Sequence, residues 1–252
     1  MRPVLVRILS LVAFGCVLAV VFVNLGQWQL RRLDERQARN AAVVAAEAAP
    51  VADWHDYFTR PLTEADEWHR VRISGTYDPE HQYVVRFRHN GDVRGYEVVT
   101  PLRTDDGTVV LVNRGFAPVS SGEQMPTSAP PPPAGQVELI GMVRIDERGG
   151  PGAEDPNQGQ VRVINSEKIG AALGEPVASG WLHLLESDPA QDSTLVPAEG
   201  AKLDEGPHLS YAVQWFLFTL VGVIGIIVFI RTELKDRRKQ RDRRVKQDSR
   251  AG

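Results

Sequence analysis

The stretch AVQWFLFTLVGVIGIIVFI, residues 212–230, contains no charged side chain. A helix rises about 1.5 Å per residue, so a run of this length covers the roughly 30 Å hydrocarbon core of a bilayer. A second uncharged run occupies residues 8–25, near the start of the chain. The sequence therefore predicts two transmembrane helices with one long segment between them.

The first apolar run could also belong to a secretory signal, because Arg2 and Arg7 precede it. A signal needs a cleavage site of small residues soon after the run. Here the run is followed by GQWQLRRLDER (26–36), which is bulky and charged, and the alanine-rich stretch begins only at residue 41. We therefore expect an uncleaved membrane anchor.

Charge divides the chain sharply. Residues 231–252 carry ten Lys or Arg against four Asp or Glu, whereas residues 31–230 carry 17 basic and 28 acidic groups, a net charge of −11. Basic residues beside a span stay in the cytoplasm. We expect a multi-pass protein of the plasma membrane with both termini cytoplasmic and the middle segment extracytoplasmic, although Arg31, Arg32, Arg36 and Arg39 oppose this orientation.

The expected organisation has four parts. They are an N-terminal transmembrane helix (1–30), an extracytoplasmic β-rich domain (31–207), a C-terminal transmembrane helix (208–230) and a basic cytoplasmic tail (231–252). The tail is typical of a solvated end that can also contact anionic lipid headgroups, and we expect no nucleic-acid partner for a membrane-tethered chain.

Several kinds of chemistry are excluded by composition. Cys16 is the only cysteine, so there is no disulfide, no thiol-exchange pair and no covalent haem motif. The sequence contains no hydrolase, zinc-protease or nucleotide-binding motif. The six histidines show no ligand spacing. We expect no enzyme activity. An extracytoplasmic hydrolase remains an open alternative, if the fold brings Ser, His and Asp residues from separate parts of the sequence together.

The sequence of the middle segment predicts mainly β-strands. Short β-branched and aromatic stretches end at turn residues, and Asn90-Gly91 favours a tight hairpin in which both residues take positive φ. The order indicates an antiparallel meander, followed by a short helix capped by Ser166. The expected fold class is two transmembrane α-helices flanking a mainly antiparallel β (α+β) extracytoplasmic domain. The expected strands are 69–77, 82–89, 95–102, 108–119, 136–145, 160–165 and 181–187.

Two clusters are candidates for partner binding. Gln27, Trp28 and Gln29 lie at the expected membrane edge, where they could contact a membrane partner or simply form an aromatic-belt anchor. The second cluster, VNRGFAP (112–118), contains Arg114, Gly115 and Phe116. A glycine there suits a β-bulge, and Arg114 could close an ion pair within the domain or meet an acidic group outside it.

The third cluster is PHLSYAVQWF (207–216), at the start of the second apolar run. In a helix that begins early, His208, Tyr211 and Trp215 lie at i, i+3 and i+7 on one face. A neutral imidazole at headgroup level can offer a nitrogen to haem iron, whose apolar ring fits the lipid edge. The alternative is a polar N-terminal residue in an aromatic belt.

These clusters, together with LGQWQLRRL (25–33), GYEVVTPL (95–102) and the two-span organisation, resemble the Surfeit locus protein 1 family. The resemblance covers essentially the whole chain, and the chain looks most like an actinobacterial member of the family. It implies a membrane-anchored assembly factor for cytochrome c oxidase. Such a factor assists haem a insertion or stabilises the haem a/copper subunit, and the position of His208 implies a haem a ligand.

The resemblance leaves one alternative function open. In the alternative, the chain is a stable accessory subunit or scaffold of a respiratory oxidase supercomplex and does not handle haem. In either case the expected partners are oxidase subunits, chiefly the haem a/copper subunit, and membrane lipid.

Overall fold

The computed structural model describes residues 2–120, 122–126, 128–198 and 200–251. The chain forms two compact units, one made of Met1–Asn40 with Leu203–Gly252 and one made of Ala41–Lys202. The first unit consists mainly of two long helices, α1 (Arg2–Ala48) and α4 (His208–Ala251), although α1 from Ala41 onwards belongs to the second unit. Both are long and apolar enough to cross a membrane, which confirms the expected pair of apolar helices at the two ends of the chain.

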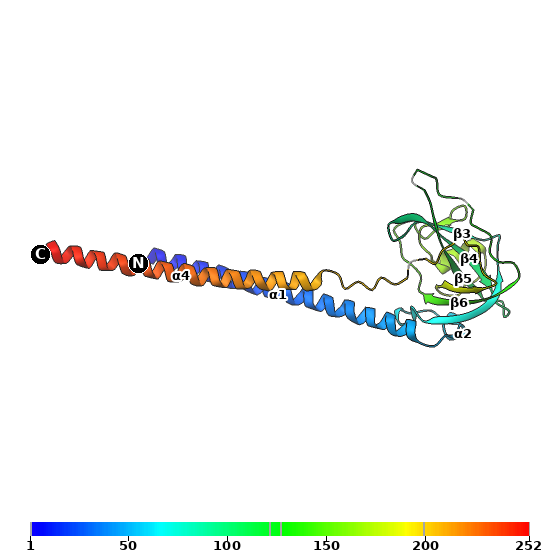
Figure 1. Ribbon diagram of the computed structural model, residues 1–252, viewed down its shortest axis with the longest axis horizontal. Helices are drawn as coiled ribbons and strands as arrows, with labels where there is room; N and C mark the ends of the chain where they lie inside the picture. Colours follow the sequence, from blue (N-terminus) through cyan, green and yellow to red (C-terminus); the bar gives the residue numbers. More distant parts are fainter. Residues whose placement is uncertain (1, 121, 127, 199, 252) are drawn as a thin grey trace. The chain divides into compact units, whose positions relative to one another are not determined.

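The two helices lie side by side in an antiparallel pair (Figure 1). A side chain at Gly15 would overlap Ile226, and a side chain at Gly26 would overlap Phe216. Small residues at such points let membrane helices approach closely. The absence of side chains at Gly15 and Gly26 therefore lets the two helices pack closely at two positions.

The second unit is a β-barrel with additions. The five strands β2, β6, β8, β5 and β4 follow one another around the barrel, and pairing of β2 with β4 closes it. Strand β3 pairs with β4, and the short strands β1 and β7 pair in parallel with β2 and β3. The bounds are β1 (Ala52–Asp53), β2 (Arg70–Tyr77), β3 (Tyr83–Asn90), β4 (Val93–Arg103), β5 (Val109–Pro118), β6 (Gln136–Arg144), β7 (Gln160–Val161) and β8 (Trp181–Asp188).

Two apolar clusters make up most of the domain core. One fills the barrel with residues from all five barrel strands, such as Ile73, Leu102 and Leu139. The other lies where the helix α3 (Ser166–Leu173) packs on the sheet, and it includes Ile169 and Trp181. The short helices α2 (His55–Phe58) and η1 (Glu64–Asp66) complete the described elements. The expected β-rich domain between two apolar helices is thus confirmed.

Local details differ from the expectations. The meander holds only for β3, β4 and β5. Strand β2 pairs with β6 and β4 rather than with β3, and β8 pairs in parallel with β5 and so separates it from β6. Asn90 ends β3, and the two turn residues are Gly91, with φ 60°, and Asp92, an arrangement typical of a type II′ turn. The cap of α3 is Asn165, whose side chain accepts a hydrogen bond from the Lys168 amide.

Candidate functional site

His208 is the first residue of α4, directly after Gly206 and Pro207. Its Nδ1 lies 2.8 Å from Oε1 of Gln29 on α1. An amide oxygen only accepts hydrogen bonds, so Nδ1 carries the proton and donates it. In the neutral imidazole with this tautomer, Nε2 keeps its lone pair, the state in which a histidine binds a metal.

Gly206 lies beside the Nε2 edge of this imidazole. Its φ is 70°, in the left-handed region that glycine adopts easily. A Cβ atom at this position would lie 3.4 Å from Nε2 and 3.3 Å from Cδ2 of His208. A side chain at this position would therefore crowd Nε2.

The predicted stripe on α4 divides into two parts. Trp215 faces α1, where its ring centroid lies 5.5 Å from that of Phe22, and it meets Phe218 edge-on at 5.9 Å. Tyr211 is 47% exposed. The structure thus brings His208 and Trp215 onto the face that contacts α1, with Tyr211 beside them on an open face.

Of the three residues predicted at the membrane edge of α1, Gln29 is the one that forms a described hydrogen bond with α4. Gln27 is exposed, and Trp28 is 45% exposed, with the guanidinium carbon of Arg32 5.9 Å from its ring. The sequence prediction grouped these residues as one partner surface. In the structure the amide of Gln29 faces α4, whereas the side chains of Gln27 and Trp28 are exposed.

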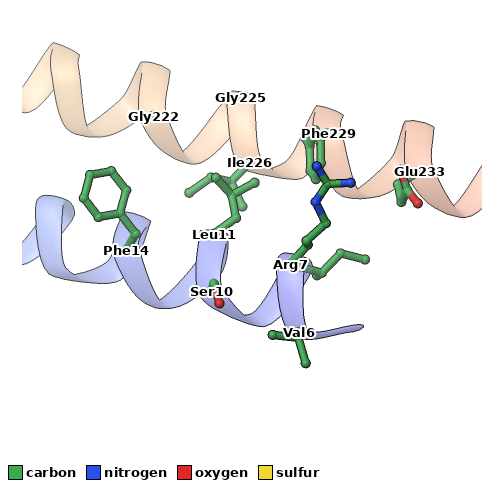
Figure 2. Close-up of a pocket in the computed structure, with 11 residues that line it drawn as sticks. Val6, Arg7, Ser10, Leu11, Phe14, Gly222, Gly225, Ile226, Phe229 and Glu233 are labelled. Carbon is green, nitrogen blue, oxygen red and sulfur yellow. The ribbon is translucent and has the colours of Figure 1, made fainter. Parts of the chain in front are cut away.

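A groove opens between the helices beyond the aromatic residues. Its inner part, about 200 Å³, is apolar and includes Phe22, Phe218 and Gly222. It continues into a wider cavity of about 880 Å³, where Arg7 on α1 and Glu233 on α4 mark the end nearest the N-terminus (Figure 2). The helix pair therefore carries an apolar recess on the same unit as His208.

Arg114 lies in the β domain and is completely buried. Its Nη1 donates to Gln82 Oε1 and to the Pro130 carbonyl, both at 2.8 Å, and its Nη2 donates to the Pro131 carbonyl at 3.0 Å. Burial lowers the pKa of this guanidinium. Among the described residues no carboxylate pairs with it, so neutral oxygens of the proline loop take the place of the expected structural ion pair.

Gly115 and Phe116 are also enclosed. The pairing of β4 with β5 shifts register between Val98 and Val99, which makes the expected β-bulge at Arg114 and Gly115. Gly115 has φ 131°. Phe116 is 2% exposed and exchanges two backbone hydrogen bonds with Val196. This cluster therefore organises the interior of the domain and presents little surface to a partner.

Partly buried charges in the domain form a network of ion pairs. Arg88 lies 3.1 Å from Glu97 and 2.6 Å from Glu147, joining β3, β4 and the segment after β6. Burial raises the pKa of Glu97. Burial, and then the charge of Arg144, lowers the pKa of His183 to about 4. Within the described ranges no group of three His, Cys, Asp or Glu side chains could hold a metal ion.

We expect His183 to make the domain less stable in acid. Its folded-state pKa of about 4 lies below the ordinary value of 6.5. Between these values the unfolded chain binds more protons, so this contribution is fully present above pH 6.5 and is lost as the pH falls towards 4. The loss is up to about 3 kcal/mol. Urea unfolding of wild type and His183→Gln at pH 7 and pH 4.5 measures it, and an equal drop in both proteins would contradict the assignment.

Comparison with known proteins was made for the whole chain. Residues 16–220 match the SURF1 family. A SURF1-like protein of Mycobacterium tuberculosis (strain ATCC 25618 / H37Rv) is 30% identical over 227 residues, which cover 87% of this chain and 82% of the relative. A SURF1-like protein of Rickettsia bellii is 25% identical over 235 residues, 91% and 94% of the two chains. A family match over most of the sequence, together with a mycobacterial relative that agrees with the expected lineage, shows that the chain belongs to the SURF1 family.

Proposed function

We propose that this chain is a membrane-anchored assembly factor that holds haem a at His208 for delivery to the haem a/copper subunit of cytochrome c oxidase. Membership of the SURF1 family supports a role in oxidase assembly in general. The single observation that carries the haem proposal is the 2.8 Å contact between His208 Nδ1 and Gln29 Oε1. In the neutral ring this contact would leave Nε2 free to bind iron and would fix the orientation of the imidazole.

The residues near His208 suit an apolar, planar group. Gly206 has no side chain to crowd Nε2, and the aromatic rings of Trp215, Phe22 and Phe218 supply an apolar surface about two to three helical turns further along the pair. Haem a, when bound, would supply the redox iron that the oxidase needs. The role of the protein would be to hold the haem ring, to keep His208 in one tautomer and to exclude water.

The proposed location is the plasma membrane, with both termini in the cytoplasm and the β domain outside. The antiparallel packing of α1 and α4 supports placing the two chain ends on one side of the bilayer. The ten basic residues of the tail support the cytoplasm as that side.

A second candidate is a scaffold or stable accessory subunit of the oxidase without haem handling. The exposed Gln27 and Trp28 favour it, because an aromatic and an amide on the outer face of α1 are suited to contact another membrane protein.

One experiment separates the two candidates. The chain is expressed in cells that make haem a, purified in detergent and examined by visible spectroscopy and for copurified oxidase subunits. A Soret band in fractions free of oxidase supports haem binding. A colourless protein that still recovers oxidase subunits supports the scaffold and contradicts the haem proposal.

We expect Gln29→Leu to weaken haem a binding by about 10–100-fold, the usual effect of removing the outer partner of a ligating histidine. The matched control is Gln27→Leu, which makes the same change two residues away on an exposed position of α1. The measurement is haem a titration of the purified proteins, followed at the Soret band. Equal affinities for the two variants would show that the Gln29 contact does not position His208.

A further inference from the structure

Phe87 on β3 combines two unfavourable features. Its φ is 60°, in the left-handed region that a bulky residue rarely adopts, and 48% of its surface is exposed. Such strain costs about 1–3 kcal/mol and occurs most often at functional sites. Neither feature stabilises the domain, so the position needs another explanation.

A β-bulge creates this conformation. The pairing of β3 with β4 is regular at Val85 and again from Arg88, with a register shift between them. Arg86 and Phe87 fall in the shifted segment. Bulges redirect individual side chains without ending a strand. The bulge therefore turns an aromatic ring outwards at a defined point of the sheet.

Two arginines accompany the ring. The guanidinium carbon of Arg86 lies 4.7 Å from the ring centroid of Phe87, and that of Arg162 lies 5.5 Å from it. Arg86 is also fixed by a 2.9 Å hydrogen bond from its Nη1 to Gln160 Oε1. We call these three residues, Arg86, Phe87 and Arg162, the Phe87 patch.

The charge of the Phe87 patch is not neutralised within the domain. In the described part of the chain, neither Arg86 nor Arg162 forms an ion pair with a carboxylate, whereas Arg88 next to them pairs with two. The surrounding segment, residues 31–230, has a net charge of −11. A cationic, aromatic spot on an acidic domain is suited to bind an acidic surface elsewhere.

We propose that the Phe87 patch is a docking surface for an acidic protein surface, in which carboxylates meet the two guanidiniums around an apolar site for the ring. The proposal rests on the proposed function, which makes this partner a subunit of the oxidase. Aromatic residues and arginine are enriched in protein interfaces and dominate their binding energy. Because the ring and Arg86 are held in place before binding, little conformational freedom is lost on docking.

A protein surface fits these observations better than a lipid surface. Attraction to anionic headgroups is typical of several mobile basic residues with a broad apolar face. The Phe87 patch has one ring and two guanidiniums, and a planar guanidinium matches a carboxylate by two parallel hydrogen bonds. The chain also has two helices that can anchor it in a membrane.

The test uses the tagged full chain in nanodiscs of phosphatidylcholine alone, incubated with detergent-solubilised oxidase. The variants are Phe87→Gly and the double change Arg86→Gln with Arg162→Gln. We expect each to lower the recovery of oxidase by about tenfold or more, as for a central interface residue. We also expect Phe87→Gly to raise the melting temperature of the domain, because glycine relieves the strained φ.

Matched controls are Leu185→Ser, which removes another exposed apolar side chain, and Arg103→Gln, which removes an exposed arginine already paired with Glu175. Both should recover oxidase like wild type. Unchanged recovery by the Phe87 patch variants would overturn this inference and leave the proposed function standing. A wild-type chain that recovers no oxidase would overturn both. Dependence on Phe87 only in nanodiscs with phosphatidylglycerol would overturn the protein partner in favour of lipid.

Discussion

Changing His208 to alanine is expected to remove haem a from the purified protein. His208 is the side chain at the start of α4 whose Nε2 is left free by the bond to Gln29, and alanine leaves no nitrogen in its place. A ligand contributes more than the outer partner that orients it, so the loss should exceed the 10–100-fold effect of Gln29→Leu. The measurement is the Soret absorbance per mole of protein after purification from cells that make haem a.

The control for this prediction is Leu209→Ala. Leu209 is the next residue of α4 and is exposed, so its truncation tests general damage to the start of the helix. Imidazole added to His208→Ala should restore part of the Soret band, because a free ligand can occupy the space that the side chain leaves. A His208→Ala protein that retains full haem content would contradict the proposed ligand.

The second large effect concerns the β domain. Gly115→Val is expected to destabilise the domain by about 3–5 kcal/mol, which combines backbone strain with a steric clash. Gly115 has φ 131°, and a Cβ atom there would lie 2.4 Å from the carbonyl oxygen of Val196. Two backbone hydrogen bonds to Phe116 hold Val196 in place, so its carbonyl cannot move away from a new side chain without breaking them.

Gly107→Ala separates the two causes. Gly107 also has a positive φ, 88°, but a Cβ atom there would meet nothing within 4 Å. We expect it to cost only about 1 kcal/mol, the strain of a left-handed residue. Urea unfolding of the full chain, followed by tryptophan fluorescence, compares the variants. A Gly115→Val protein as stable as Gly107→Ala would contradict the close approach to Val196.

The broad architecture could be read from the sequence because its signals are local. An uncharged run of sufficient length identifies a spanning helix whatever surrounds it, and β-branched stretches between turn residues identify β2 to β6. The position of β8 is different. Its pairing in parallel with β5 joins segments far apart in the chain, and no local pattern encodes which strand it joins.

The candidate site was partly predictable. The place of His208 before an apolar run is recognisable in the sequence, but the bond to Gln29 is not directly predicted by it. A signal existed, since Gln29 stands four residues after Leu25 and His208 four residues before Ala212, so antiparallel helices bring them to one level. Phe87 gave no such signal, because a bulge depends on how two strands pair rather than on their composition.

The same cross-helix bond sets an order of events during biosynthesis. Gln29 leaves the ribosome early, whereas His208 follows the entire β domain in the chain. Domains fold as units while synthesis continues, so the barrel can fold while the first helix alone is inserted. The imidazole acquires its partner only when the last helix joins the first, and a prematurely terminated chain would have a folded barrel but would lack His208, the ligand of the proposed haem site.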